Sequence, residues 1–222
     1  MALLKSNKHV FWQALILALI IFNFGIFLGY MLENSRVGKV SQLYAESELD
    51  LLDVKIQSEL FSLNLPNLNC EAAIEENINF ADTVYADAKI LDRFEQASKI
   101  TDSIILQHKK YDLLRTLFWI NSIEIKKQCN ASYHNVVYFY HYNGPSLEQK
   151  AKQVVFSKLL EQLKANEGDN VMLIPIAADN NITSVNFLLK AYNITSLPTV
   201  LIDEKFEITE LTNLEEIEKY LG

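Results

Sequence analysis

The sequence predicts an α/β domain at the C-terminal end of the chain, preceded by a membrane-spanning helix and a pair of long helices. Three patterns indicate this organisation. An uncharged apolar run lies near the start of the chain, and long amphipathic helical patterns follow it. From residue 135 onward, short β-branched runs alternate with helical patterns. With 222 residues, half of them apolar, the chain is long enough for one or two packed domains.

The composition argues against several classes of function. The formal net charge is −8, whereas binding to nucleic acid requires basic side chains that neutralise phosphates. The two cysteines, Cys70 and Cys129, have no nearby cysteine or histidine at metal-ligand spacing, and the four histidines are scattered. The sequence therefore predicts no nucleic-acid partner, no metal site and no cofactor.

Residues 10–32 form an apolar run without a charged side chain. A helix of about 23 residues at 1.5 Å per residue crosses a bilayer. A cleaved signal peptide is the competing interpretation, but it needs a shorter apolar region and a small-x-small cleavage site, which Tyr30–Glu33 does not offer. We therefore expect residues 1–9 to be a short tail and residues 10–32 to be an uncleaved anchor in the lipid bilayer.

The orientation of the anchor does not follow from its flanking charges. Lys5 and Lys8 precede the apolar run, and Arg36 and Lys39 follow it, so the basic residues are nearly balanced. We expect a cytoplasmic N-terminus and an extracytoplasmic C-terminal domain, because the disulfide predicted below forms in an oxidising compartment.

Gly25 and Gly29 form a small-xxx-small pair within the anchor. Such a pair lets two membrane helices approach closely, which predicts helix packing and a homodimer through this face. Glycine is common in membrane helices, so an ordinary anchor without a helical partner is the alternative.

Two helical regions follow the anchor. Residues 33–66 keep helical spacing and form a predicted stalk, which ends at the turn signal Asn64–Pro66. Residues 67–130 contain two amphipathic patterns that meet near residue 100, the first capped by Asn69. Because a short connection between long helices favours antiparallel neighbours, we expect a helical hairpin over 67–130.

The hairpin predicts a disulfide. Cys70 lies about thirty residues before the turn and Cys129 about thirty residues after it, so an antiparallel pair brings the two cysteines level. Two independent small apolar side chains are the alternative.

Residues 135–222 alternate strands and helices. The first strand begins at Val136 and ends before Gly144-Pro145, where a helix opens and continues to Gly168. Later elements are the strand Val171–Ala177, a helix over Ser184–Tyr192, the strands Thr199–Asp203 and Phe206–Thr209, and a last helix opened by a capping box from Thr212 to Glu215.

Two motifs in this region resemble the thioredoxin family. The corner Tyr142-Asn143-Gly144-Pro145-Ser146 is similar to the family's active-site corner, Trp-Cys-Gly-Pro-Cys, and Leu197-Pro198-Thr199 is similar to the approach to its cis-proline. Together with the anchor and the hairpin, the chain resembles membrane-anchored thioredoxin-like proteins of small-genome archaea. The resemblance implies a minimal thioredoxin-like domain over 135–222, with a mixed four-stranded sheet and flanking helices. Pro175 suits an edge strand, which we expect to be open.

The resemblance does not extend to the chemistry. Asn143 and Ser146 replace the two thiols of the family, and neither an amide nor a hydroxyl can attack a disulfide. Val137 and Pro175 replace the Asp and Lys that assist proton transfer in the family. The sequence therefore predicts that the corner is not an enzyme active site.

The remaining prediction is a binding role. The resemblance implies a groove along the cis-proline loop Leu197, Pro198 and Thr199, with Tyr142 on its other side. In this groove, an extended peptide of a protein partner pairs with the backbone. A scaffold or chaperone-like function follows. Two alternatives stay open: a redox protein that uses Cys70 and Cys129 as a dithiol pair, and a purely structural membrane stalk.

Overall fold

The computed structural model describes residues 8–62, 69–97 and 102–221. The chain divides into two compact units, one up to Glu46 and one from Ser47 onward, and each is described by itself. The predicted tail before Lys8, the end of the stalk at 63–66 and the hairpin turn near residue 100 lie outside the described residues.

Helix α1, Lys8–Ser62, begins in the first unit and ends in the second. Within it, Val10–Leu32 is a stretch long and apolar enough to cross a membrane, and its side chains are exposed. A Cβ added at Gly25 or Gly29 would meet nothing within 4 Å. The amide of Asn23 donates to the carbonyl of Leu19 at 2.7 Å, so this polar group is bonded within its own helix.

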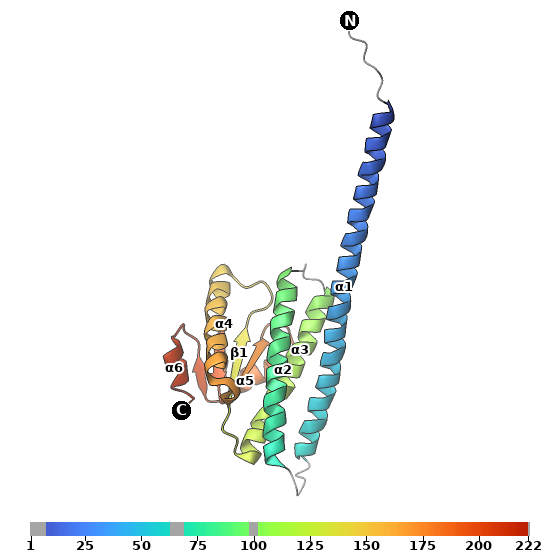
Figure 1. Ribbon diagram of the computed structural model, residues 1–222. Helices are drawn as coiled ribbons and strands as arrows, with labels where there is room; N and C mark the ends of the chain where they lie inside the picture. Colours follow the sequence, from blue (N-terminus) through green and yellow to red (C-terminus); the bar gives the residue numbers. More distant parts are fainter. Residues whose placement is uncertain (1–7, 63–68, 98–101, 222) are drawn as a thin grey trace. The chain divides into compact units, whose positions relative to one another are not determined.

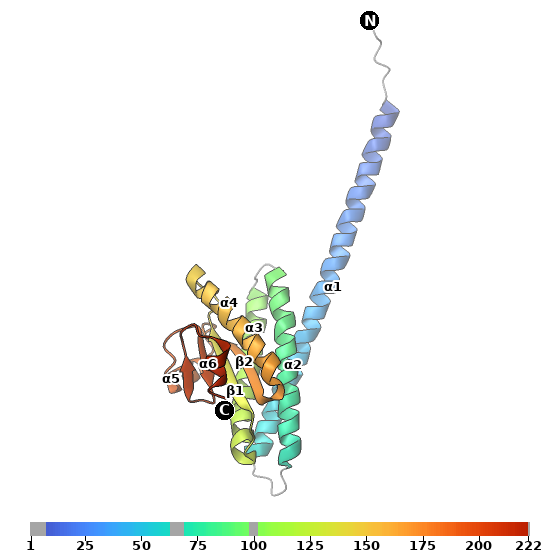
Figure 2. The same cartoon turned by 60° about the vertical axis from the view of Figure 1, so that its left-hand side comes forward.

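The second unit contains a mixed four-stranded sheet (Figures 1 and 2). Its strands are β1 (His134–Tyr140), β2 (Val171–Ala177), β3 (Thr199–Ile202) and β4 (Phe206–Ile208), in the spatial order β2-β1-β3-β4. Strands β1 and β2 are parallel, and the other two pairs are antiparallel. Strand β1 is therefore central and bonded on both sides.

The strand register brings four loops to one end of the sheet. Phe139 pairs with Thr199, so β1 ends where β3 begins. Val200 pairs with Ile208, so β4 ends at the same level. Because β2 runs parallel to β1, its carboxyl end lies there too. The loops 141–146, 178–182, 193–198 and 209–213 consequently meet at this end.

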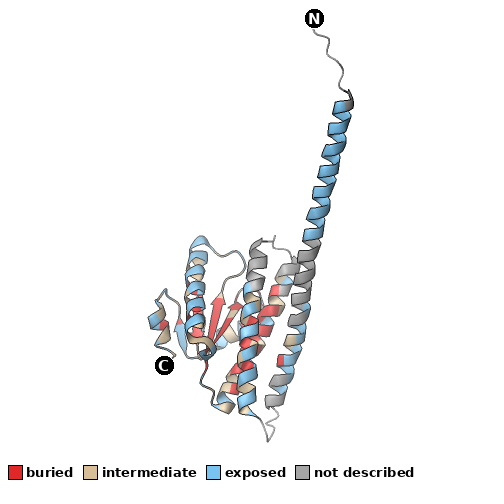
Figure 3. Ribbon diagram, viewed as in Figure 1, coloured by how far each residue is buried: buried red, intermediate tan, exposed pale blue. Residues whose placement is uncertain are grey.

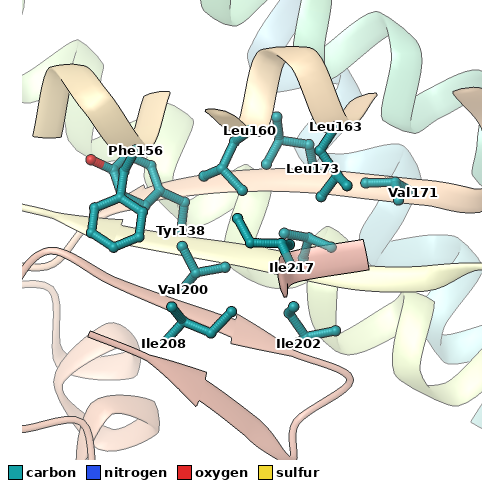
Figure 4. Close-up of a cluster of buried hydrophobic side chains, with 11 residues drawn as sticks. Tyr138, Phe156, Leu160, Leu163, Val171, Leu173, Val200, Ile202, Ile208 and Ile217 are labelled. Atoms are coloured by element: carbon teal, nitrogen blue, oxygen red, sulfur yellow. The ribbon is translucent and has the colours of Figure 1, made fainter. Parts of the chain in front are cut away.

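One core lies between the sheet and the helices α4 (Leu147–Glu167) and α6 (Leu214–Glu218). Figure 4 shows the side chains that fill it, among them Tyr138, Phe156, Leu160, Val200 and Ile217. A short 3-10 turn, η1 (Gly168–Asn170), connects α4 to β2.

Helix α3 (Asp102–Cys129) packs against β1 and β2 and also contacts α5 (Thr183–Ala191). The rings of Trp119 on α3 and Phe139 on β1 lie 5.9 Å apart, and both side chains are buried. Figure 3 shows the buried residues along the strands and the inner side of α3.

The helical hairpin is part of this packed unit. Helix α2, Cys70–Ala97, lies beside α3, and a disulfide joins Cys70 to Cys129 with their Cα atoms 5.3 Å apart. The predicted disulfide is therefore present. The regions predicted over 67–130 and 135–222 belong to one compact unit, in which α2 and α3 pack on the sheet.

The sheet edge at β2 is covered, whereas we expected it to be open. Helix α2 packs against β2, and every residue of β2 except Pro175 is buried. Lys89–Glu161 and Asp82–Lys164 ion pairs, at 3.5 and 2.6 Å, join α2 to α4. The edge prediction was wrong because it did not consider that the hairpin packs along this strand.

Two helix starts also differ from the prediction. Helix α4 begins at Leu147 with Ser146 as its N-cap, so Pro145 precedes the helix instead of lying in its first turn. Helix α6 is capped by Asn213, whose side chain accepts from the Glu216 N–H, one residue later than the predicted box.

The disulfide provides a test of how the hairpin stabilises the unit. It links residues 59 apart in sequence, and we expect Cys70→Ser/Cys129→Ser to lower the free energy of unfolding. In the chain-entropy model a loop of that length contributes about 4 kcal/mol. Denaturant unfolding of the full chain in detergent measures the difference, and equal midpoints for the two proteins would contradict the prediction.

Candidate functional site

The candidate site is the end of the sheet where the four loops meet. The corner 141–146 follows β1, and Asp179 and Asn180 follow β2 in the neighbouring loop. Since β1 and β2 are adjacent and parallel, the two loops lie side by side. The first of them contains the five residues of the predicted degenerate corner.

Asp179 holds the start of the corner. Its carboxylate accepts the backbone N–H groups of Tyr142 and Asn143, each at 2.8 Å. The His141 ring nitrogen lies 3.5 Å from the same carboxylate. The Asn143 amide donates to the Asn180 side chain at 2.9 Å and to the Asp179 carbonyl at 3.3 Å. Asn143 therefore ties the two loops together.

Ser146 has a local structural task. Its hydroxyl accepts the Gln149 N–H at 3.2 Å, and the Gln149 side chain accepts the Ser146 N–H at 2.9 Å. This reciprocal capping box satisfies two N–H groups that the start of a helix leaves without partners. Gly144 has φ of +59°, a conformation that glycine adopts at little cost and that turns the chain between Asn143 and the helix.

Tyr142 faces α3. Its ring stacks on His108 with ring centroids 3.8 Å apart and an angle of 24° between the planes. The same His108 ring bonds the Tyr140 hydroxyl through Nε2 at 3.0 Å. The ring of Tyr142 therefore lies against the helical hairpin, and its predicted place beside a peptide groove stays a prediction.

Asp112 lies beneath this contact and is fully buried. Its carboxylate accepts the Asn180 amide at 2.8 Å and the Ala177 N–H at 3.2 Å. His108 and Arg115, also buried, each place a nitrogen 3.6 Å from it. A buried carboxylate requires such partners, because transfer out of water is costly. Asp112 therefore connects α3 to the end of β2. Through Asn180, it also connects α3 to Asn143 in the corner.

Burial has a direct effect on this carboxyl group. Loss of hydration raises the pKa of Asp112 above its ordinary value, and the His108 and Arg115 side chains and the bond from Asn180 oppose the rise without cancelling it.

Sequence reasoning did not select His108, Asp112 or Asp179. A signal was present, because His108, Asp112 and Arg115 follow one another at spacings of four and three residues, which puts them on one face of a helix. Polar residues on a helix face otherwise lined by Tyr111, Phe118 and Trp119 indicate a buried polar contact. Asp179 directly follows a strand parallel to the one that leads to the corner.

The second predicted motif lies at the same end of the sheet. The peptide bond Leu197–Pro198 is cis. Pro198 and Thr199 are buried, Leu197 is half-buried, and the Thr199 hydroxyl donates to the Ser196 carbonyl at 2.6 Å. Because Thr199 pairs with Phe139, the proline loop lies beside the end of β1.

Exposed leucines lie at this end of the sheet. Leu147, the first residue of α4, is 89% exposed, and Leu211, in the loop after β4, is 51% exposed. Lys152 on α4 and Glu210 beside Leu211 form an ion pair of 3.5 Å, which connects the helix to that loop. The described residues bring together no group of three His, Cys, Asp or Glu side chains that could hold a metal ion.

The cystine lies at the opposite end of the sheet. Cys129 precedes β1, whereas the corner follows it, and β1 has seven residues. A strand of that length spans about 20 Å at 3.3 Å per residue. The predicted pairing of Cys70 with Cys129 is confirmed. In the structure, neither cysteine lies near the corner.

A second polar cluster anchors that opposite end. Asp203, in the β3–β4 turn, accepts Lys126 Nζ at 2.6 Å, His134 Nδ1 at 2.6 Å and the Asn135 N–H at 3.0 Å. The neighbouring Glu204 accepts Trp119 Nε1 at 2.7 Å. Burial by itself raises the pKa of Asp203, but the bonds from Lys126, His134 and Asn135 outweigh it and hold the pKa below its ordinary value.

Removal of the Asp112 carboxylate tests the contact beneath the corner. We expect Asp112→Ala to destabilise the protein by on the order of 3 kcal/mol, because it leaves the Arg115 guanidinium buried without its counter-charge. Asp169→Ala, at an exposed position in η1, is the matched control and should stay within about 0.5 kcal/mol of wild type. Equal midpoints of denaturant unfolding for the two variants would show that the contact contributes nothing.

The cluster at Asp203 predicts a dependence on pH. Since the pKa of Asp203 is lower in the folded than in the unfolded protein, its stabilisation is present above the unfolded value of about 3.9 and is lost as pH falls through the folded value. Asp203→Asn, which tolerates the φ of +48° at this position, should therefore differ from wild type at pH 7 and converge with it in acid. Unfolding free energies across that pH range measure this, and a constant difference would refute it.

No family model, no curated protein and no solved structure matches this chain.

Proposed function

We propose that this chain is a membrane-anchored, thioredoxin-like module that binds an extended segment of a protein partner outside the cytoplasm and performs no redox chemistry at its corner. The thioredoxin-like part is supported by the strand order β2-β1-β3-β4, with one parallel pair and helices on both faces. The strand that follows α4 is the edge strand, as the minimal form of that fold requires. The two motifs that carry the resemblance lie at one end of this sheet.

One observation carries the proposal of a redox-inactive corner. The side chains at the two thiol positions both have structural tasks: Asn143 ties two loops together, and Ser146 caps α4. With Asn143 and Ser146 at these positions, the corner has no nucleophile, and both side chains stabilise the loop conformation instead. It supplies no thiolate for disulfide exchange.

The exposed leucines support a binding role for this surface. Leu147 and Leu211 are on elements joined by the Lys152–Glu210 ion pair, and the proline loop lies at the same end of the sheet. Extended peptides gain affinity from backbone pairing and specificity from apolar side-chain contacts. Beside the Leu197–Pro198 bond, a peptide would find both.

The location outside the cytoplasm rests on two features. Val10–Leu32 has the length and composition of a single anchor, and the Cys70–Cys129 disulfide suits an oxidising compartment. The alternative use of the two cysteines as a working dithiol would require a second reactive centre at the other end of the sheet. The separation of the cystine from the corner favours a structural role.

A peptide array probed with the full chain in nanodiscs tests the proposal. We expect wild type to bind a subset of extended decapeptides, and Leu147→Asp/Leu211→Asp to weaken that binding at least tenfold, because charge replaces the apolar contacts. Val154→Asp/Val155→Asp, two exposed positions further along α4, is the matched control and should bind like wild type. No binding by wild type would favour the purely structural stalk. Equal binding by both variants would place the binding surface elsewhere.

A further inference from the structure

Two helices of the second unit expose apolar side chains in regular stripes. On α1 the stripe consists of Leu49, Leu52 and Ile56, and on α3 it consists of Leu106, Leu113 and Ile120. The exposed fractions run from 38% at Leu113 to 67% at Leu49. The spacings of three, four and seven residues keep each stripe on one face of its helix. We refer to these six residues as the helix patch.

The two stripes adjoin each other. Lys110 on α3 forms an ion pair with Glu48 on α1, which sets the two helices side by side. Leu106 and Leu113 lie four residues before and three after Lys110, so they share its face of α3. Leu52 lies four residues after Glu48 and likewise shares its face of α1. The buried side of α3, with Tyr111, Phe118 and Trp119, faces the hairpin and the sheet, so the α3 stripe points away from both.

We propose that the helix patch is the interface at which a second copy of this chain pairs with the first. Monomeric proteins rarely expose contiguous apolar patches of more than a few hundred Å². At 1.5 Å per residue, the patch runs about 20 Å along α3 and about 10 Å along α1. A standard interface covers roughly 800 Å² on each partner with its polar rim, and a patch of this extent suits the apolar centre of one.

The charges around the helix patch select a copy of the same chain. Between residues 48 and 59, α1 carries four acids and one base, Lys55, whereas the charged residues of α3 that flank Leu106 and Leu113 without being fully buried are Lys109 and Lys110. A two-fold axis parallel to the two helices sets α1 of one copy against α3 of the other, because such an interface pairs each patch with itself. The acidic helix of each copy then faces the basic helix of its partner. The same surface is self-complementary in charge as well as in apolar area.

This pairing differs from a dimer formed through Gly25 and Gly29. The helix patch belongs to the second unit, whereas the two glycines belong to the first. Variants can therefore address the two surfaces independently. Substitution of an exposed residue of the helix patch by glutamate adds charge to the proposed interface and leaves the hydrophobic core unchanged.

The test is the subunit number of the full chain in nanodiscs or detergent, measured by mass photometry over a dilution series. We expect wild type to be a dimer and Leu52→Glu/Leu113→Glu to dissociate at concentrations at least tenfold higher. Val154→Glu/Val155→Glu, which adds the same charges at exposed apolar positions of α4, should dimerise like wild type. Thermal unfolding of each variant confirms that it is folded.

Three results would overturn the proposal. They are a wild-type monomer throughout the series, a dimer that persists in Leu52→Glu/Leu113→Glu, and a dimer abolished only by Gly25→Leu/Gly29→Leu. In the third case, pairing resides in the membrane helix.

Discussion

The carboxylate of Asp112 connects the helical hairpin to the sheet, and the conformation of the corner depends on it. It bonds the end of β2 directly and reaches Asn143 through Asn180. His108, one turn earlier on the same helix, stacks on Tyr142. Because Asp112, His108 and Asn180 are buried, their polar contacts act in a medium of low dielectric constant, where a lost partner is costly. The hairpin therefore stabilises the end of the sheet that carries the corner.

Helix α3 makes a comparable contact at each end of the sheet. Near its start, His108 and Asp112 hold the corner, and near its end, Lys126 bonds Asp203 in the β3–β4 turn. Between them, Trp119 packs on Phe139 and donates to Glu204. The disulfide then fixes the end of α3 to the start of α2. The sheet is thus held against one long helix by polar bonds at both ends and aromatic packing in the middle.

In this arrangement, the residues that support the corner differ from those of the proposed binding surface. Asn143 and Ser146 are used to build the corner, so the exposed part of the sheet end is left to Leu147, Leu211 and the proline loop. The helix patch lies on different elements, α1 and α3. The proposed peptide binding and the proposed pairing of two copies therefore use different residues of the chain.

Local patterns in the sequence determined most of the elements: the apolar span, the hairpin helices, the four strands and the pairing of Cys70 with Cys129. Each of these depends on periodicity or on turn residues close together in the chain. The tertiary structure alone decided that α2 covers β2, that Tyr142 faces His108 and that Asp112 bonds Ala177. Each of these contacts joins residues at least 34 positions apart in the sequence. No local spacing encodes which distant surface a helix will cover. The residues that hold the corner come from the loop after β2, with Asp179 and Asn180, and from α3, with His108, and no local pattern around residues 142–146 indicates them.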